Sequence, residues 1–140
     1  MKLVLDTNVL VSGIRSRKGA SNPLLVAGFR GRFRWMCSVP LFCEYEAVLR
    51  RAEVLSKMGV TPEEMDKFLT DVAGRIQPVD LRFGWRPQVK DPDDEMVLEA
   101  AANARADALV THNVKDFGEA PGRFGVVLLT PAEALKRMEQ

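Results

Sequence analysis

Short apolar stretches alternate with longer amphipathic stretches along this chain, and this order limits the folds open to it. Apolar runs of about four to eight residues bounded by turn residues are typical of strands, whereas apolar residues at helical spacing are typical of helices. The alternation favours an α/β fold in which a parallel sheet has helices on both faces. We predict strands over 2–6, 34–38, 76–80, 107–111 and 125–129, and helices over 21–31, 40–55, 62–75, 92–105, 114–117 and 131–139.

The length of 140 residues is typical of one compact domain, and no linker or repeat divides the chain, so we predict a single domain over 1–140. No apolar stretch reaches the roughly 18 residues of a membrane-spanning helix, and the apolar start is too short for a signal peptide. We therefore expect a cytoplasmic protein without membrane contact.

Cys37 and Cys43 lack zinc-site spacing and are expected to be buried, reduced thiols, with a disulfide as the alternative.

A carboxylate directly follows the first predicted strand, because Leu3-Val4-Leu5 runs into Asp6. Ligands of parallel α/β sheets bind at the carboxyl ends of the strands, so Asp6 is expected to face a crevice. A second polar cluster, from Thr111 to Asp116, follows the strand predicted over 107–111. If these two strands are neighbours, both clusters open on one crevice.

Helical spacing separates acids that point inward from acids that point to solvent. In the helix predicted over 40–55, Glu44 borders the apolar face and Glu46 points nearly opposite. In the next acidic helix, Asp94 lies on the apolar face and Glu95 lies on the far side. Burial of such carboxylates is unfavourable unless a cation is present.

The candidate acids have hydroxyl and amide neighbours, and such hard oxygen donors suit Mg²⁺ or Mn²⁺ rather than zinc. An ion of this kind can activate water and polarise a phosphate. The chain has a single His and no Gly-rich phosphate loop, which leaves few other mechanisms. The residues therefore favour metal-assisted hydrolysis of a phosphodiester.

Four motifs follow one another along the chain. They are Leu5-Asp6-Thr7-Asn8-Val9-Leu10-Val11-Ser12-Gly13, Glu44-Tyr45 with Val48-Leu49, Asp91-Pro92-Asp93-Asp94, and Leu109-Val110-Thr111-His112-Asn113-Val114-Lys115-Asp116-Phe117. In this order they resemble the PIN-domain (PilT N-terminus) ribonucleases, specifically the compact bacterial branch of toxins from toxin-antitoxin pairs. The resemblance implies a three-layer α/β/α sandwich whose central parallel sheet has the strand order 3-2-1-4-5.

The resemblance also implies a set of acids that bind the metal and act in catalysis: Asp6, Glu44, Asp94 and Asp116. It further implies supporting residues that orient the ligands or bind phosphate: Asn8, Ser12, Thr111 and Asn113. Asn113 departs from the family pattern, because many relatives have Asp there, so Asp116 alone supplies the fourth acid. His112 occupies a variable position and receives no role from the resemblance. From the residues alone it is an exposed polar side chain or a general base.

The implied activity is divalent-metal-dependent cleavage of single-stranded or structured RNA, leaving 5′-phosphate and 3′-hydroxyl ends. The implied partners are the RNA, an antitoxin that covers the crevice, and a second copy in a homodimer. Basic side chains near the crevice are candidates for contact with the RNA backbone: Arg15, Arg17 and Lys18. Trp35 or Trp85 could stack on bases, although a buried Trp is the commoner outcome.

Each acid also has a purely structural interpretation. Asp6 could cap a helix, Glu44 could pair with Arg51, and Asp116 could cap a short turn. Asp91 suits an N-cap before Pro92, and the acids that follow could complement the helix dipole.

Two other functions remain as alternatives. One is a catalytically silent PIN-like module that binds RNA or protein, which Asn113 favours. The other is a phosphatase with an aspartyl nucleophile, but no second Asp lies two residues after Asp6.

Overall fold

The computed structural model describes residues 1–82 and 87–139. Its strands form one parallel sheet in the order β3-β2-β1-β4-β5, which confirms the predicted fold class and strand order. Among the described helices, none has both the length and the apolar character required to cross a bilayer. The elements are β1 (Lys2–Leu5), α1 (Thr7–Arg15), α2 (Ser21–Phe29), β2 (Arg34–Ser38), α3 (Val39–Leu49), α4 (Ala52–Met58), α5 (Pro62–Arg75), β3 (Gln77–Val79), α6 (Pro92–Ala104), β4 (Ala108–Val110), α7 (Val114–Phe117), α8 (Ala120–Arg123), β5 (Val127–Leu129) and α9 (Pro131–Glu139).

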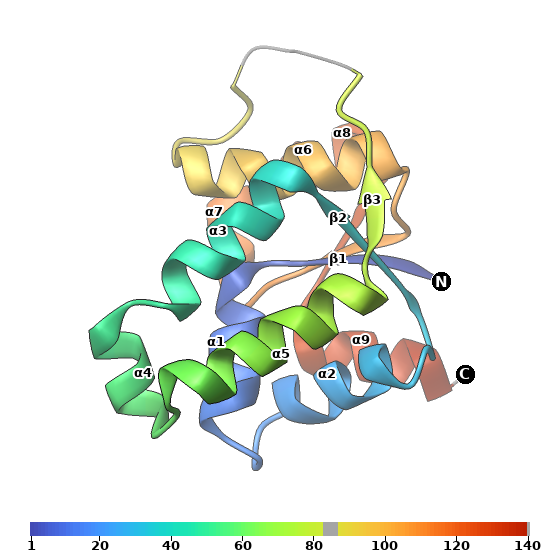
Figure 1. The fold of residues 1–140 in the computed structure, drawn as a ribbon. Coiled ribbons are helices and arrows are strands. Elements are labelled where there is room, and N and C mark those ends of the chain that lie inside the picture. Colours follow the sequence, from blue (N-terminus) through green and yellow to red (C-terminus); the bar gives the residue numbers. More distant parts are fainter. Residues whose placement is uncertain (83–86, 140) are drawn as a thin grey trace.

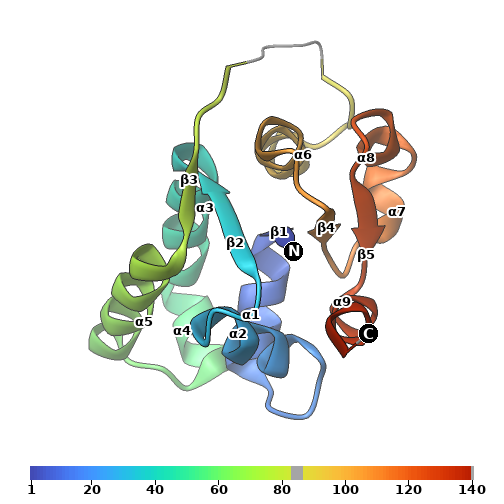
Figure 2. The same cartoon turned by 90° about the vertical axis from the view of Figure 1, so that its right-hand side faces the viewer.

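Helices cover both faces of the sheet (Figures 1 and 2). Helix α6 lies across one face and contacts β1, β2, β3 and β4. Helices α1, α2 and α9 lie on the opposite side, where α2 packs against both α1 and α9. Helix α3 contacts α1 and α6, so it lies between the two helical layers at the carboxyl edge of the sheet.

The central strand β1 is buried because it has a parallel neighbour on each side and helices over both faces of the sheet. It pairs with β2 and with β4, and Leu3, Val4 and Leu5 are all fully buried. Strands covered on both faces are continuously apolar rather than alternating, as these three residues are. The sheet thereby holds the carboxyl end of β1 in a fixed position between α1, α3 and α6.

Several predicted element bounds differ from the observed ones. Strands β1, β3, β4 and β5 are one or two residues shorter than predicted, a difference that is usual at the ends of elements. The helix predicted over 40–55 is two helices, α3 and α4, separated by Arg51 in an extended conformation. Helices α1 and α8 were not predicted. Thr7 and Asn8 looked like turn formers, and the Pro121-Gly122 pair in α8 is typical of a turn.

Trp35 is almost fully buried, which is the outcome expected as the commoner one, so it does not stack on bases at the surface. Its ring has edge or tilted contacts with those of Phe29, Phe33 and Tyr45. The other candidate, Trp85, lies outside the described residues.

The cysteine prediction is partly wrong. Both thiols are free, but only Cys37 is buried, and Cys43 is exposed on α3. Burial raises the pKa of the Cys37 thiol to about 12.

Helix α1 packs closely on α2 because Gly13 has no side chain. A Cβ atom at Gly13 would lie 2.5 Å from Cδ1 of Leu25 and 3.1 Å from the backbone oxygen of Ser21. The Gly13→Ala variant should therefore lose about 1–3 kcal/mol of unfolding free energy in urea denaturation, as is usual when a packed interface is overfilled.

The matched control for this variant is Gly74→Ala in α5, where an added Cβ meets nothing within 4 Å. This control should be neutral or should gain up to about 1 kcal/mol, because Ala favours helix. Equal stability of the two variants would contradict the close approach of α1 and α2.

Candidate active site

Asp6 and Thr111 lie side by side because each directly follows one of two paired strands. Leu5 of β1 pairs with Val110 of β4, and the backbone N–H of Asp6 donates to the Val110 carbonyl at 2.9 Å. Thr111 then donates a hydrogen bond from Oγ1 to Oδ2 of Asp6 at 2.8 Å. The two polar clusters predicted from the sequence therefore meet at one edge of the sheet.

A small hydrogen-bond network holds the Asp6 carboxylate. Asn8 donates from Nδ2 to Oδ2 of Asp6 and to Oγ1 of Thr111, each at 3.3 Å. The backbone N–H of Asn113 donates to the same Thr111 hydroxyl at 3.0 Å, and that of His112 donates to Oδ1 of Asn8 at 3.3 Å. Thr111 and Asn8 thus orient the Asp6 carboxylate through their hydrogen bonds to Oδ2.

The interpretation of Asp6 as a helix cap is wrong. Asp6 occupies the N-cap position of α1, but its side chain makes no capping hydrogen bond. It is only 7% exposed, and this burial is the main reason that its pKa is raised. The hydrogen bond from Thr111 acts in the opposite direction and favours the charged form.

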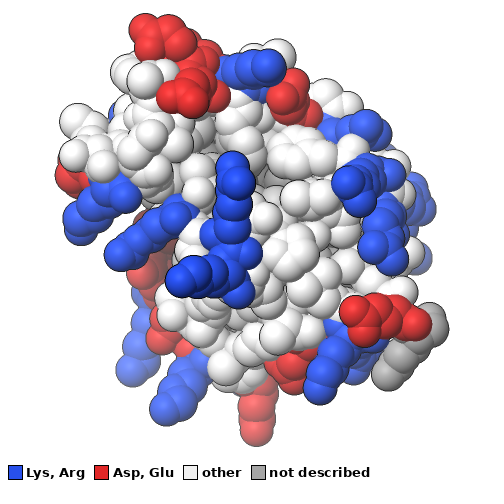
Figure 3. Space-filling view, turned by 90° about the horizontal axis from the view of Figure 1, so that it is seen from below, with Lys and Arg blue, Asp and Glu red and all other residues white. Residues whose placement is uncertain are grey.

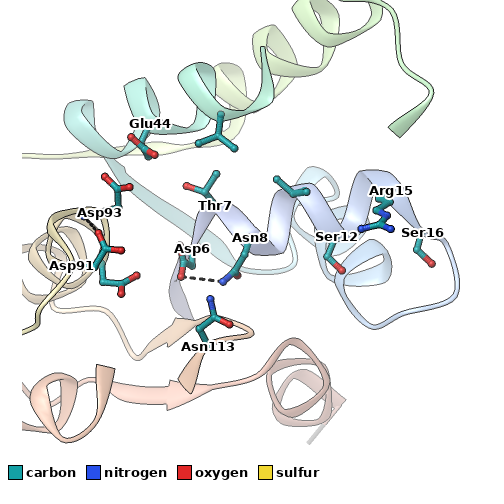
Figure 4. Close-up of a pocket in the computed structure, with 13 residues that line it drawn as sticks. Asp6, Thr7, Asn8, Ser12, Arg15, Ser16, Glu44, Asp91, Asp93 and Asn113 are labelled. Atoms are coloured by element: carbon teal, nitrogen blue, oxygen red, sulfur yellow. Dashed lines mark hydrogen bonds between the residues drawn. The ribbon is translucent and has the colours of Figure 1, made fainter. Parts of the chain in front are cut away.

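A cavity of about 560 Å³ opens beside Asp6 at the carboxyl edge of the sheet (Figure 4). Its walls come from α1, α3, the start of α6 and the segment after β4. The sequence-predicted residues that line it are Asp6, Asn8, Ser12, Arg15, Glu44, Asp94 and Asn113.

Glu44 lies on the wall of this cavity, and Glu46 does not. Glu46 instead lies 3.8 Å from Arg50 in an exposed ion pair. Figure 4 shows Glu44 and Asp93 facing each other from α3 and α6. Burial raises the pKa of Glu44, and the negative charge of Asp93 raises it further, against a smaller opposite effect of Arg51.

Asp94 also lines the cavity, and it is partly buried. Its pKa is raised to about 6 by burial, followed by the charges of Asp6, Asp91 and Asp116. Glu95 lies elsewhere, where its carboxylate accepts hydrogen bonds from the backbone N–H groups of Gln88 and Val89. Asp91 caps α6 by accepting from the Asp93 N–H at 2.9 Å, as its structural interpretation predicted.

Asp116 lies in an adjoining cavity of about 490 Å³ rather than in the first one. Asp91 and Asp94 line both cavities, so the two spaces meet along the start of α6. The charge of Asp116 raises the pKa of both Asp6 and Asp94. Asp116 is therefore electrostatically part of the acidic cluster, although it does not share the wall of the main cavity.

Of the basic candidates, only Arg15 lines the cavity. It is the last residue of α1, and Figure 4 shows it at the opposite end from the acids. Arg17 and Lys18 are exposed in the connection between α1 and α2 and line neither cavity. Figure 3 shows further Lys and Arg side chains across the face where α2 and α9 lie.

The sequence prediction gave no site role to four polar wall residues of the main cavity: Thr7, Ser16, Asp91 and Asp93. Asn8 and Ser12 are spaced at i and i+4 on one face of α1, and Ser16 follows as the C-cap of that helix.

The donor set suits a hard divalent cation. Burial raises the pKa values of Asp6, Glu44 and Asp94, and the charge of Asp6 further raises those of Glu44 and Asp94. Among the described side chains that line the cavity, Arg15 is the only cation. In the described part of the chain, no group of three His, Cys, Asp or Glu side chains lies close enough together to hold an ion. Mg²⁺, however, is usually bound by one or two carboxylates together with several water molecules, and the side chains present fit this kind of site.

Comparisons with known proteins agree with this fold. The family model described as PIN domain matches residues 2–115. A chain in the crystal structure of VapBC2 from Rickettsia felis, bound to a DNA fragment from their promoter, is similar with a TM-score of 0.59 and 18% sequence identity. The similarity covers 93% of this chain and 98% of that chain, and at this identity it concerns the fold. No curated protein matches the chain.

The raised pKa of Asp94 has a consequence for stability. Because the folded-state pKa is about 6 rather than the usual 3.8, the native protein binds more protons than the unfolded chain between these values. Stability should therefore fall as pH rises through this window. We expect Asp94→Asn to raise the melting temperature at pH 7.5, without divalent ions, by about 2–5 °C.

This difference should vanish near pH 4, where Asp94 is protonated in the wild type. Asp71→Asn, which alters an exposed acid on α5, is the control and should follow the wild type at both pH values. If the melting temperatures of the wild type and Asp94→Asn depend on pH in the same way, the pKa of Asp94 is not raised to about 6.

Proposed function

The chain belongs to the PIN-domain family, whose members are typically nucleases, and from this premise we propose that it is a divalent-metal-dependent endoribonuclease. Its substrate is single-stranded or structured RNA, cut to leave 5′-phosphate and 3′-hydroxyl ends. The observation that supports this most is the convergence of Asp6, Glu44 and Asp94 from three segments on one cavity, where burial raises all three pKa values and the charge of Asp6 further raises those of Glu44 and Asp94.

We assign the metal-binding and catalytic role to four acids: Asp6, Glu44, Asp94 and Asp116. Mg²⁺ or Mn²⁺, when bound, would supply positive charge opposite the scissile phosphate and lower the pKa of a water molecule. Thr111 and Asn8 hold the Asp6 carboxylate in one orientation through their hydrogen bonds to Oδ2. A ligand held in this way loses little conformational freedom when a cation binds.

The remaining wall residues suit the RNA backbone. Ser12 and Asn113 present a hydroxyl and an amide to the cavity that could bind a phosphate oxygen. Arg15, at the far end of the same cavity, supplies the positive charge that a neighbouring phosphate requires. Arg17 and Lys18 extend this basic character along the exposed connection to α2. A bound RNA strand would then lie along the cavity from the carboxylates to Arg15.

We further propose that the protein is the cytoplasmic toxin of a toxin-antitoxin pair, acts as a homodimer and folds as one domain over 1–140. The family membership and the likeness in fold to a chain of the VapBC2 structure support this assignment. The antitoxin would cover the main cavity and place a basic side chain among the acids. Such a residue would offset the repulsion from neighbouring acids that, after burial, raises the pKa of Asp94.

Neutral replacement of a cavity acid should abolish RNA cleavage. We expect Asp6→Asn and Glu44→Gln each to reduce the rate with Mn²⁺ by at least about 100-fold, because each removes a negative ligand from the site. The measurement is cleavage of a fluorophore-quencher RNA by purified protein, with circular dichroism to verify that each variant is folded.

Glu46→Gln is the matched control, because Glu46 lies two residues away on α3 and does not line the cavity. It should cleave at the wild-type rate. The assignment is wrong if Asp6→Asn cleaves as fast as the wild type. In bacteria, expression of the wild type should arrest growth and expression of Asp6→Asn should not, whereas equal growth would argue against the toxin role.

The alternative, a silent PIN-like binding module, is favoured by Asn113 at a position where many relatives have Asp. A thermal titration separates the two functions, since an ion that binds only the native state must stabilise it. For the nuclease, millimolar Mn²⁺ should raise the melting temperature by about 5 °C. The shift should be much smaller in Glu44→Gln and unchanged in Glu46→Gln. Absence of any shift in the wild type would favour the silent module.

A further inference from the structure

A buried serine and the single histidine of the chain are hydrogen-bonded beside the acidic cavity but outside its walls. Ser21 begins α2 and is 1% exposed, and its Oγ lies 2.8 Å from Nε2 of His112. Neither side chain lines the main cavity. The bond joins a helix on one side of the sheet to the segment that follows β4, at a separation of 91 residues along the chain.

Ser21 is held in place from α1. Its backbone oxygen would lie 3.1 Å from a Cβ at Gly13, so the helices approach closely at this point. The next residue, Asn22, donates from Nδ2 to the Gly13 carbonyl at 2.9 Å. The Ser21 hydroxyl is therefore a fixed anchor for the imidazole of His112.

The bond does not require one protonation state of His112. A hydroxyl both donates and accepts, and an imidazole nitrogen accepts when bare and donates when protonated. The Ser21 hydroxyl can thus bind Nε2 of either neutral tautomer or of the cation.

The anchored segment determines which way the Asn8 amide points. The backbone N–H of His112 donates to Oδ1 of Asn8, so Nδ2 is directed toward Asp6 and Thr111. An amide turned by 180° would place Oδ1 against the Asp6 carboxylate, where two acceptors repel each other. A shift of the His112 backbone would remove one of the hydrogen bonds that oppose this rotation, beside those of Nδ2 to Asp6 and Thr111.

We propose that Ser21 and His112 are positioning residues, whose hydrogen bond fixes residues 111–113 and thereby directs the Asn8 amide toward the Asp6 carboxylate. The kinetic part of this inference rests on the proposed nuclease function. The structural part does not, because the orientation of Asn8 can be measured without RNA.

The kinetic test compares Ser21→Ala, His112→Ala and the conservative His112→Gln. We expect kcat for RNA cleavage to fall about 10- to 100-fold in the two alanine variants, the range usual for loss of an outer partner of a ligand. KM should remain within about twofold, because neither side chain lines the cavity. His112→Gln retains a long polar side chain and should recover most of kcat. Ser56→Ala, an exposed position on α4, is the control and should leave kcat unchanged.

The structural test is the side-chain NH₂ signal of Asn8 in ¹⁵N-resolved NMR. Its hydrogen bonds should slow solvent exchange in the wild type and in His112→Gln, and exchange should be at least about fivefold faster in Ser21→Ala. Unchanged Asn8 exchange in Ser21→Ala, or a kcat loss that His112→Gln does not recover, would overturn the positioning role. If the wild type cleaves no RNA but Asn8 exchange responds as expected, the nuclease proposal fails and the positioning role stands.

Discussion

The parallel pairing of β1 with β4 is the constraint on which the acidic site depends. The register of this pairing places Leu5 beside Val110. Asp6 and Thr111, which directly follow these residues, therefore meet at the edge of the sheet. Neighbouring side chains of a strand point to opposite faces, so a slip of one residue would separate these two groups. The full burial of Leu3, Val4 and Leu5 opposes such a slip. The same packing that stabilises the sheet thus holds the carboxylate.

Much of the fold could be predicted because strand and helix signals alternate clearly. Parallel pairing and the surrounding helices follow from that alternation, and the strand order came from the family resemblance. Helix α1 escaped prediction because Thr7 and Asn8 are common in turns, and because α1 is stabilised by packing on α2 at Gly13 rather than by a side-chain cap from Asp6. The break between α3 and α4 lies at Arg50-Arg51, where neither Pro nor Gly marks it.

The acidic site was predictable where helical spacing decides direction. Helical spacing distinguished Glu44 from Glu46 and Asp94 from Glu95. As predicted, Glu44 and Asp94 line the cavity, and Glu46 and Glu95 do not. Spacing could not place Asp116, because α7 has only four residues and the turns around it determine its direction. Nor could it show that Thr111 binds Asp6, since that contact spans 105 residues and depends on which strands are neighbours.

The exposed thiol of Cys43 on α3 is a site for chemical labelling next to a residue of the cavity wall. Cys43 directly precedes Glu44, yet it is exposed and does not line the cavity. The other thiol, Cys37, is buried with a pKa of about 12, so it has almost no reactive thiolate near neutral pH. The natural sequence therefore accepts a maleimide fluorophore at one position only. A dye attached there would report the approach of RNA or a partner protein without any engineered residue.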